Sequence, residues 1–298
     1  KRSRTISDTR VSSKKEAKMK TNDKILKRMK THNTLLCCGL DPDLKKMPSE
    51  IVGKEISDEE KVFTFLQVVV DVVSPHVCAF KAQKAFFDVL AGGHDVLKKL
   101  IDYVHTSKPG IPVIVDCKIG DIKNTMEAYI QNLFGTLQAD GIVVNPYMGD
   151  DVMLPLVELA DKSIVVLVKT SNPSGGFVQD LILQDGQPLW RHMLNLVVNR
   201  WNRSENMIPV LSSTVGLNME KLRAIVPDKM PILLAGVGAQ GGSYADLRKL
   251  LNSEGIGVFI NSSRGILYPQ QGQQSWQSAV EKAAVELKEA LNKERRSR

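Results

Sequence analysis

The sequence lacks any long apolar run. No stretch of 18 or more apolar residues occurs, and the basic first twenty residues lack the apolar core of a signal peptide. The only cysteines are Cys37, Cys38, Cys78 and Cys117, each in an apolar, strand-like stretch without metal-ligand spacing. This pattern is typical of reduced, buried thiols, so we expect a cytoplasmic protein. Because no apolar run is long enough, we also expect that it neither crosses nor anchors in a membrane.

Histidine and aromatic residues are also scarce. The five histidines show no HxxxH or HxH spacing, and His94 and His105 lie in a predicted helix with its own apolar stripe. No Ser-His-Asp or Cys-His arrangement has supporting context. Trp190 and Trp201 fall at helical spacing with apolar neighbours, which indicates packing and not base stacking. We therefore expect no metal site.

Positive charge is in excess, but only at one end. Residues 1–30 hold twelve Lys or Arg against three Asp or Glu, a surplus of nine that exceeds the net charge of +7, so the remainder carries −2. We predict a flexible or loosely helical extension at 1–30 and a catalytic domain at 31–298. Contact of the extension with RNA, a membrane or another protein is the less favoured alternative.

Beyond residue 30, short β-branched apolar runs alternate with longer segments of helical period, eight of each. Strands that are apolar throughout are typical of a parallel sheet covered by helices. Eight such units predict a closed (β/α)8 TIM barrel, and an open doubly wound sheet is the alternative. The predicted strands are 34–40, 76–81, 111–118, 141–145, 163–169, 208–213, 231–236 and 257–261.

Polar residues follow these strands, where barrel active sites are built. The third unit, "DCKIGDIKNT", is the most concentrated. Asp116 and Lys118 are two apart and so project from one face of a strand, and Gly120 permits a turn to Asp121, which is either a charged site residue or a helix N-cap. Lysines and aspartates that converge on one barrel mouth suit a reaction in which negative charge develops and a proton is delivered.

The last two units predict a phosphate site. The glycine-rich "GVGAQGGS" at 236–243 precedes a helix, whose free backbone N–H groups favour an anion. Arg264 follows the eighth strand, as expected of a phosphate-binding cation. Residues 171–188 are too long and too rich in Gly, Pro and Asn for an ordinary connection, which predicts either a lid or a short packed helix or hairpin.

The motifs "GLDPD", "FKAQKAFF", "DCKIGDIKNT", "VKTSNPSGG", "GVGAQGG" and "NSSRGI", in this order, resemble orotidine 5′-phosphate decarboxylase, in particular the branch with the longer "VKTSNP" loop. The resemblance covers about residues 34–270. It implies a catalytic tetrad of Lys81, Asp116, Lys118 and Asp121. The substrate-binding residues that it implies are Asp41, Gln83, Ile122, Thr125, Thr170, Ser171, Gln240, Ser263 and Arg264.

The resemblance also implies a reaction and partners. The expected activity is cofactor-free decarboxylation of orotidine 5′-monophosphate to UMP in pyrimidine biosynthesis, in a homodimer whose Asp121, Ile122 and Thr125 enter the neighbouring site. Two alternatives stay open. One is aldol-type chemistry on a sugar phosphate, as in hexulose-phosphate synthase, which would use Mg²⁺ on the carboxylates. The other is a nucleic-acid-binding protein, which would explain the basic extension but not the tetrad.

Overall fold

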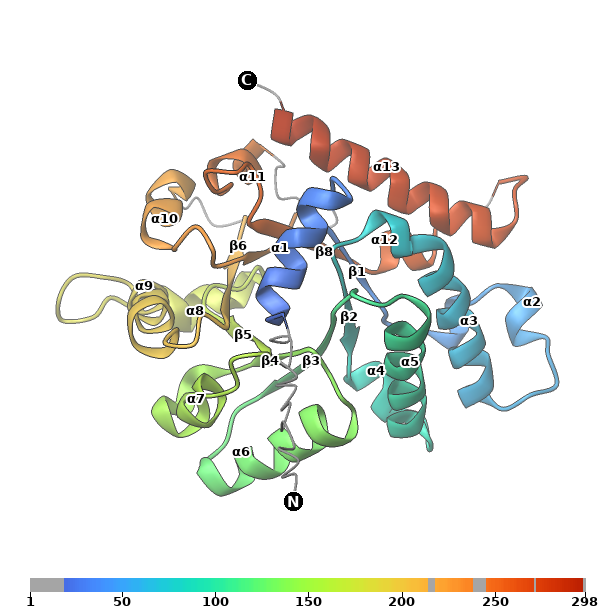
Figure 1. The fold of residues 1–298 in the computed structure, drawn as a ribbon, viewed down its shortest axis with the longest axis horizontal. Coiled ribbons are helices and arrows are strands. Elements are labelled where there is room, and N and C mark those ends of the chain that lie inside the picture. Colours follow the sequence, from blue (N-terminus) through green and yellow to red (C-terminus); the bar gives the residue numbers. More distant parts are fainter. Residues whose placement is uncertain (1–18, 214–217, 238–244, 271, 297–298) are drawn as a thin grey trace, which may run out of the picture.

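The fold is a closed barrel of eight parallel strands, each paired with the next and β1 paired with β8 (Figure 1). The computed structural model describes residues 19–213, 218–237, 245–270 and 272–296. The predicted (β/α)8 barrel is thus confirmed, and the open sheet is wrong because β1 and β8 pair through Leu36 and Ile260. The strands are β1 Leu36–Gly39, β2 Ala79–Gln83, β3 Val113–Ile119, β4 Gly141–Val144, β5 Ser163–Leu167, β6 Met207–Ser212, β7 Ile232–Ala235 and β8 Val258–Ser262.

Helices surround the barrel, and each predicted helical segment contains one. Two of them, α6 and α9, continue as π-helical turns over Gln131–Thr136 and Leu196–Trp201. The described helices are α1 Thr21–Thr31, α2 Ser49–Val52, α3 Asp58–Val73, α4 Ala85–Asp88, α5 Gly93–Ser107, α6 Lys123–Ile130, α7 Asp150–Val157, α8 Gly176–Gln179, α9 Leu189–Asn195, α10 Met219–Ile225, α11 Ala245–Lys249, α12 Arg264–Leu267 and α13 Trp276–Arg296. None of the helices in the described ranges is long and apolar enough to span a bilayer.

The strands are apolar because both of their faces are covered. All residues of β1, β4 and β6 are buried. The amphipathic α3 shows the complementary pattern: a capping box of Ser57 and Glu60 starts it, and it buries Phe65, Leu66 and Val69 among others. The barrel and its inner helix faces form one core, which holds the strand ends at fixed positions for a site.

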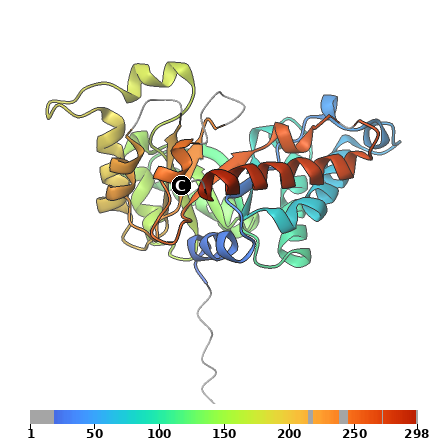
Figure 2. The same ribbon diagram turned by 90° about the horizontal axis from the view of Figure 1, so that it is seen from above.

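The later part of the predicted extension 1–30 is helical and packs on the barrel as α1. Helix α1 covers one end of the barrel, on the opposite side from α8 (Figure 2), and its Ile25 and Met29 are fully buried. Of the basic residues of this helix, Lys27 and Lys30 are exposed, whereas Lys24 and Arg28 make polar contacts with the barrel. Residues 1–18 lie outside the described residues, so the flexible extension stays a prediction for them.

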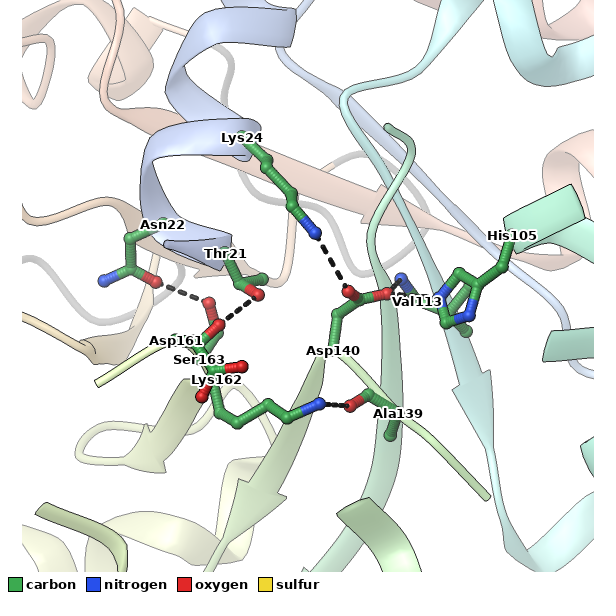
Figure 3. A network of polar contacts seen from close by, with 10 residues as sticks. All are labelled: Thr21, Asn22, Lys24, His105, Val113, Ala139, Asp140, Asp161, Lys162 and Ser163. Carbon is green, nitrogen blue, oxygen red and sulfur yellow. Dashed lines mark hydrogen bonds and ion pairs between the residues drawn. The ribbon is translucent and has the colours of Figure 1, made fainter. Parts of the chain in front are cut away.

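Polar contacts fix α1 to this end of the barrel (Figure 3). The buried Asp140 accepts hydrogen bonds from Lys24 (3.4 Å) and from the backbone N–H of Val113 (3.0 Å), and lies 2.7 Å from His105 Nε2. Asn22 accepts a hydrogen bond of 2.5 Å from Ser163 at the start of β5. Because Val113 begins β3, α1 is tied to the end of that strand opposite Asp116 and Lys118.

Residues 171–188 form a helix and a hairpin, but not the packed arrangement of the second predicted alternative. A short 3-10 turn at Pro173–Gly175 leads into α8, and Ile182 and Pro188 then form an antiparallel bridge. The segment is not packed down, because Phe177 is 83% exposed and Ile182 68% exposed. It is a helix and hairpin that stand out above the barrel end. We call it the lid segment, and its closure over a ligand stays a prediction.

Candidate functional site

The ends of β2 and β3 place one carboxylate between two ammonium groups. Asp116 accepts a hydrogen bond of 2.7 Å from Lys81 through Oδ2 and one of 2.6 Å from Lys118 through Oδ1. Asp116 and Lys81 are each 6% exposed, whereas the Lys118 side chain is 46% exposed. Lys81 is therefore a buried partner, and Lys118 presents its charge to the open end of the barrel.

Lys118 reaches Asp116 through an irregularity in β3. The pairing of β3 with β4 shifts between Asp116 and Ile119, and Lys118 has a φ of +45°. A positive φ at a residue other than glycine is uncommon and occurs where the surrounding structure fixes it, often beside active sites. The predicted meeting of Asp116 and Lys118 is confirmed, but a bulge and not regular strand alternation brings them together.

Gly120 serves a different purpose from the one expected. A Cβ on this residue would lie 2.3 Å from the carbonyl oxygen of Asn145, so no other residue fits without a backbone shift. The loops after β3 and β4 touch here, and the N–H of Asn145 also donates to the carbonyl of Ile119 at 2.7 Å. Glycine is required by close backbone contact, which holds the end of β3 against β4.

Lys81 and Asp116 hold each other ionised. Burial alone would lower the pKa of Lys81, but the nearby carboxylates of Asp116 and Asp41 offset it and raise this pKa above its usual value. Burial likewise acts to raise the pKa of Asp116, but Lys81 and Lys118 outweigh it and lower this pKa. At neutral pH the cluster is thus a buried anion between cations, with one ammonium N–H donor facing outward.

The cluster lies at the bottom of a cavity of about 360 Å³, which we call the central pocket. Thr170, Ser171 and Asn172 line one side of it, where β5 leads into the lid segment 171–188. Apolar side chains complete the wall, among them Leu167, Val143, Val210, Leu233 and Leu234. The central pocket thus combines charged and polar groups with an apolar wall, as small-molecule sites commonly do.

A second cavity, the rim pocket, has a volume of about 670 Å³ and shares Gly236 and Asn261 with the central pocket as lining residues. Asp41, Ser263 and the exposed Arg264 line it. Asp41 is fixed by the N–H of Gln83, which donates to its Oδ1 at 3.2 Å. The two pockets together offer a cationic end at Arg264 and a charged cluster at Asp116.

The lid segment is anchored to Lys169 and Thr170, which follow β5. Gln179 accepts a hydrogen bond of 3.0 Å from the N–H of Thr170, and Lys169 forms an ion pair of 2.6 Å with Asp180. Lys169 is 1% exposed, so Asp180 neutralises a buried cation at the end of β5. The lid is therefore attached beside the central pocket even though its apolar tip is exposed.

The structure leaves four predicted residues outside the lining of these two pockets: Gln83, whose N–H binds Asp41, and Asp121, Ile122 and Thr125. Asp121 accepts a hydrogen bond of 2.7 Å from the N–H of Ile122, and Ile122 is 51% exposed. The N-cap position of α6 is Ile122, so Asp121 is not the N-cap. Thr125 lines a separate cavity with Lys84. Gln240 lies outside the described residues.

Sequence reasoning missed several residues of the site. Asn261 lines both pockets and donates a hydrogen bond of 3.2 Å to Ser263. Its motif, "NSSRG", predicted Ser263 and Arg264 as site residues but not the asparagine. Lys169 lies in the motif "VKTSNPSGG", but its ion pair was not predicted, and Tyr268 had no signal. Their contacts depend on loop positions that the sequence does not show.

Metal binding has no candidate site among the residues that the structure describes. Within the described residues, no three His, Cys, Asp or Glu side chains are grouped so that they could hold a metal ion. His105 contacts Asp140 at the end of the barrel that α1 covers, far from the strand ends described above (Figure 3). The four cysteines are free, and all but Cys117 are buried.

Comparisons with known proteins point in one direction. The model of the family described as orotidine 5′-phosphate decarboxylase / HUMPS matches residues 34–279. An orotidine 5′-phosphate decarboxylase of Cupriavidus necator is 39% identical over 265 residues, 89% of this chain and 94% of that protein. One of Bordetella pertussis is 38% identical over 260 residues, covering 87% and 93%. The structure of an OMP decarboxylase of Leishmania donovani superposes with a TM-score of 0.78 at 29% identity, covering 94% and 100%.

Proposed function

The chain belongs to the orotidine 5′-phosphate decarboxylase / HUMPS family, and we propose that Lys81, Asp116 and Lys118 perform the decarboxylation of orotidine 5′-phosphate. The activity itself follows from the family and from relatives named orotidine 5′-phosphate decarboxylase, which align with this chain over most of both sequences. It is a carbon–carbon lyase reaction of pyrimidine biosynthesis. The observation that supports our assignment of residues is the carboxylate of Asp116 held at 2.7 and 2.6 Å between two lysines in the central pocket.

The proposed reaction breaks the bond between C6 of orotate and its carboxylate. CO2 leaves, the electron pair stays on C6, and the carbanion takes a proton to give UMP. The Asp116 carboxylate would lie beside the substrate carboxylate. The repulsion between these two negative charges would disfavour the ground state of the bound substrate. Lys118, with its exposed ammonium group, would stabilise the negative charge at C6 and donate the proton. Lys81 is the buried cation that keeps Asp116 ionised.

The rest of the substrate would extend from the central to the rim pocket. We assign the pyrimidine to Thr170 and Ser171, the ribose to Asp41 with Gln83 beside it, and the 5′-phosphate to Ser263 and Arg264. The shared lining of the two pockets supports this path. Gln240 remains part of the proposal for the phosphate on the strength of the sequence motif alone. Phosphate contacts far from C6 contribute to catalysis by aligning the ring with the lysines.

Aldol-type chemistry with Mg²⁺ on the carboxylates is the weaker alternative. A divalent cation at Asp116 would meet two ammonium groups already in hydrogen-bond contact with that carboxylate, and would be repelled by both. The deciding assay follows the absorbance of orotidine 5′-monophosphate in buffer with EDTA. We expect the absorbance to fall at the same rate with and without the chelator. Turnover that requires added Mg²⁺ would favour the aldol-type alternative.

We further propose a homodimer in which Asp121, Ile122 and Thr125 of one subunit complete the site of the other. Asp121 lies outside both pockets of its own chain, although its spacing from Lys118 matches the family motif. The neighbouring loops expose large apolar side chains: Ile122 is 51% exposed and Tyr147 81% exposed. The loops after β3 and β4 are in contact through Ile119 and Asn145, and exposed apolar side chains on neighbouring loops are typical of interfaces.

Mixing two inactive variants tests the composite site. Lys118→Ala and Asp121→Ala dimers should each be nearly inactive. Refolded together in equal amounts, about half of the dimers are hybrids with one intact site, so about a quarter of wild-type activity should return. The matched control mixes Lys118→Ala with Lys81→Ala, two residues of the same subunit's pocket, and should recover nothing. Equal behaviour of the two mixtures would mean that each subunit supplies its own Asp121.

The free thiols are also the basis for proposing a cytoplasmic location. The basic residues 1–18 lie outside the described residues. We propose that they take no part in catalysis, and we do not assign nucleic-acid binding to them.

A further inference from the structure

Tyr268 connects two parts of the rim pocket that are far apart in the sequence. It directly follows α12, and its N–H donates to the carbonyl of Arg264 at 3.1 Å. Its ring stacks on the buried Phe65 of α3, with the ring centres 5.7 Å apart and the planes within 5°. The ring is thus held in the core while its hydroxyl edge lines the rim pocket.

The hydroxyl of Tyr268 holds the loop after β1. It accepts a hydrogen bond of 2.6 Å from the N–H of Asp43 and donates one of 3.2 Å to the carbonyl of Asp41. The side chain of Asp41 is bound on its other side by the N–H of Gln83 at 3.2 Å. Asp41 is therefore fixed from two directions, by β2 through its carboxylate and by Tyr268 through its main chain.

We propose that Tyr268 is a positioning residue for the decarboxylation: its hydroxyl fixes Asp41 relative to Arg264, so that the ribose and phosphate of one nucleotide are held at a set separation. The inference rests on the proposed roles of Asp41 and Arg264 as substrate contacts. Tyr268 itself acts through Asp41, which also helps to keep the pKa of Lys81 high. A displaced Asp41 would thus disturb both the ribose and the charged cluster.

The hydroxyl is suited to this task because it stays protonated. Burial raises the pKa of Tyr268, and the nearby carboxylates of Asp43 and Asp41 raise it further. An O–H group that accepts from one backbone N–H and donates to one carbonyl is fully used. Its loss would leave the Asp43 N–H without that partner and release the loop that carries Asp41.

The first variant is Tyr268→Phe, which keeps the ring on Phe65 and removes only the hydroxyl. We expect kcat/KM for orotidine 5′-monophosphate to fall about tenfold, the size of one hydrogen bond, while the circular dichroism spectrum stays that of the wild type. The matched control is Tyr103→Phe, which removes a hydroxyl bonded to Asp71 at 2.7 Å on the helical surface and should leave kcat/KM unchanged. A change of less than twofold in Tyr268→Phe would overturn the proposal.

A double-mutant cycle separates positioning from general damage to the fold. If Tyr268 acts through the Asp41 side chain, Tyr268→Phe should lower kcat/KM less than twofold in an Asp41→Ala background. The same tenfold loss in both backgrounds would refute the coupling, even for a variant of lowered stability. Asp41→Ala alone tests the proposed function separately: if it keeps wild-type kcat/KM, the assignment of Asp41 to the substrate is wrong, whatever the cycle gives.

Discussion

Replacing Asp116 by asparagine should destabilise the protein in a way that depends on pH. The substitution keeps the shape of the side chain but removes the negative charge that contacts Lys81 and Lys118 at 2.7 and 2.6 Å. Lys118 can turn toward water, whereas Lys81, whose side chain is 8% exposed, cannot. The variant therefore contains a buried ammonium group with Asp41 as its remaining nearby carboxylate.

The magnitude follows from this burial. Removing one partner of a buried ion pair costs about 3–5 kcal/mol, or roughly 10 °C in the unfolding midpoint of a domain this large. In the wild type, the lowered pKa of Asp116 contributes stability that is fully present above the unfolded value of about 3.9 and is lost as the pH falls through the folded value. The raised pKa of Lys81 contributes stability below about 10.4 that is lost as the pH rises through its folded value.

In Asp116→Asn the sign for Lys81 reverses. Burial then dominates, lowers its pKa below about 10.4, and makes the variant more stable as the pH rises toward that value. We therefore expect urea unfolding to show a large deficit at pH 7 that shrinks at pH 9.5. Glu254→Gln, which breaks the exposed ion pair with Lys30, is the control and should change little at either pH. A deficit that is small, or equal at both pH values, would refute this account of the cluster.

Two further predictions concern the ends of the substrate site and of the chain. Arg264→Ala should lower kcat/KM strongly through lost phosphate binding, and added guanidinium should partly restore it; an equal defect on orotidine, which lacks the phosphate, would rule out this role. Deleting residues 1–18 should leave turnover and the unfolding midpoint unchanged, whereas deleting 1–31 should lower the midpoint steeply, because Ile25 and Met29 are fully buried and each large apolar core side chain contributes about 2–5 kcal/mol. Unfolding midpoints that match in the two deletions would show that α1 is not part of the barrel's stable core.

The sequence predicted the barrel because a parallel sheet buried on both faces leaves a strong pattern of apolar runs. The pattern could not show where α1 would lie. Its basic residues gave the same signal as a solvated extension, and Ile25 and Met29 show their role only when a barrel end is there to cover. Charge counts describe composition, while burial depends on which face of a helix meets the core.

The charged cluster was predictable in membership but not in geometry. Motif spacing gave Lys81, Asp116 and Lys118. The contact between Asp116 and Lys118 depends on a bulge and on a positive φ at Lys118, and a lysine in the sequence does not predict a positive φ. The importance of Gly120 was seen, but its reason was a contact with Asn145 in another loop. Tyr268 was invisible because its role depends on three segments that meet only in the fold.

The account depends most on Lys118 as the proton donor at C6. The direct test is kcat of Lys118→Ala, followed by the absorbance of orotidine 5′-monophosphate in chelated buffer, with the dissociation constant of UMP measured alongside. Lys98→Ala, which removes a surface lysine paired with Asp102 on α5, serves as the control and should keep full activity. We predict that Lys118→Ala has no measurable turnover but still binds UMP through the rim pocket. A fall in kcat of less than tenfold would contradict the mechanism.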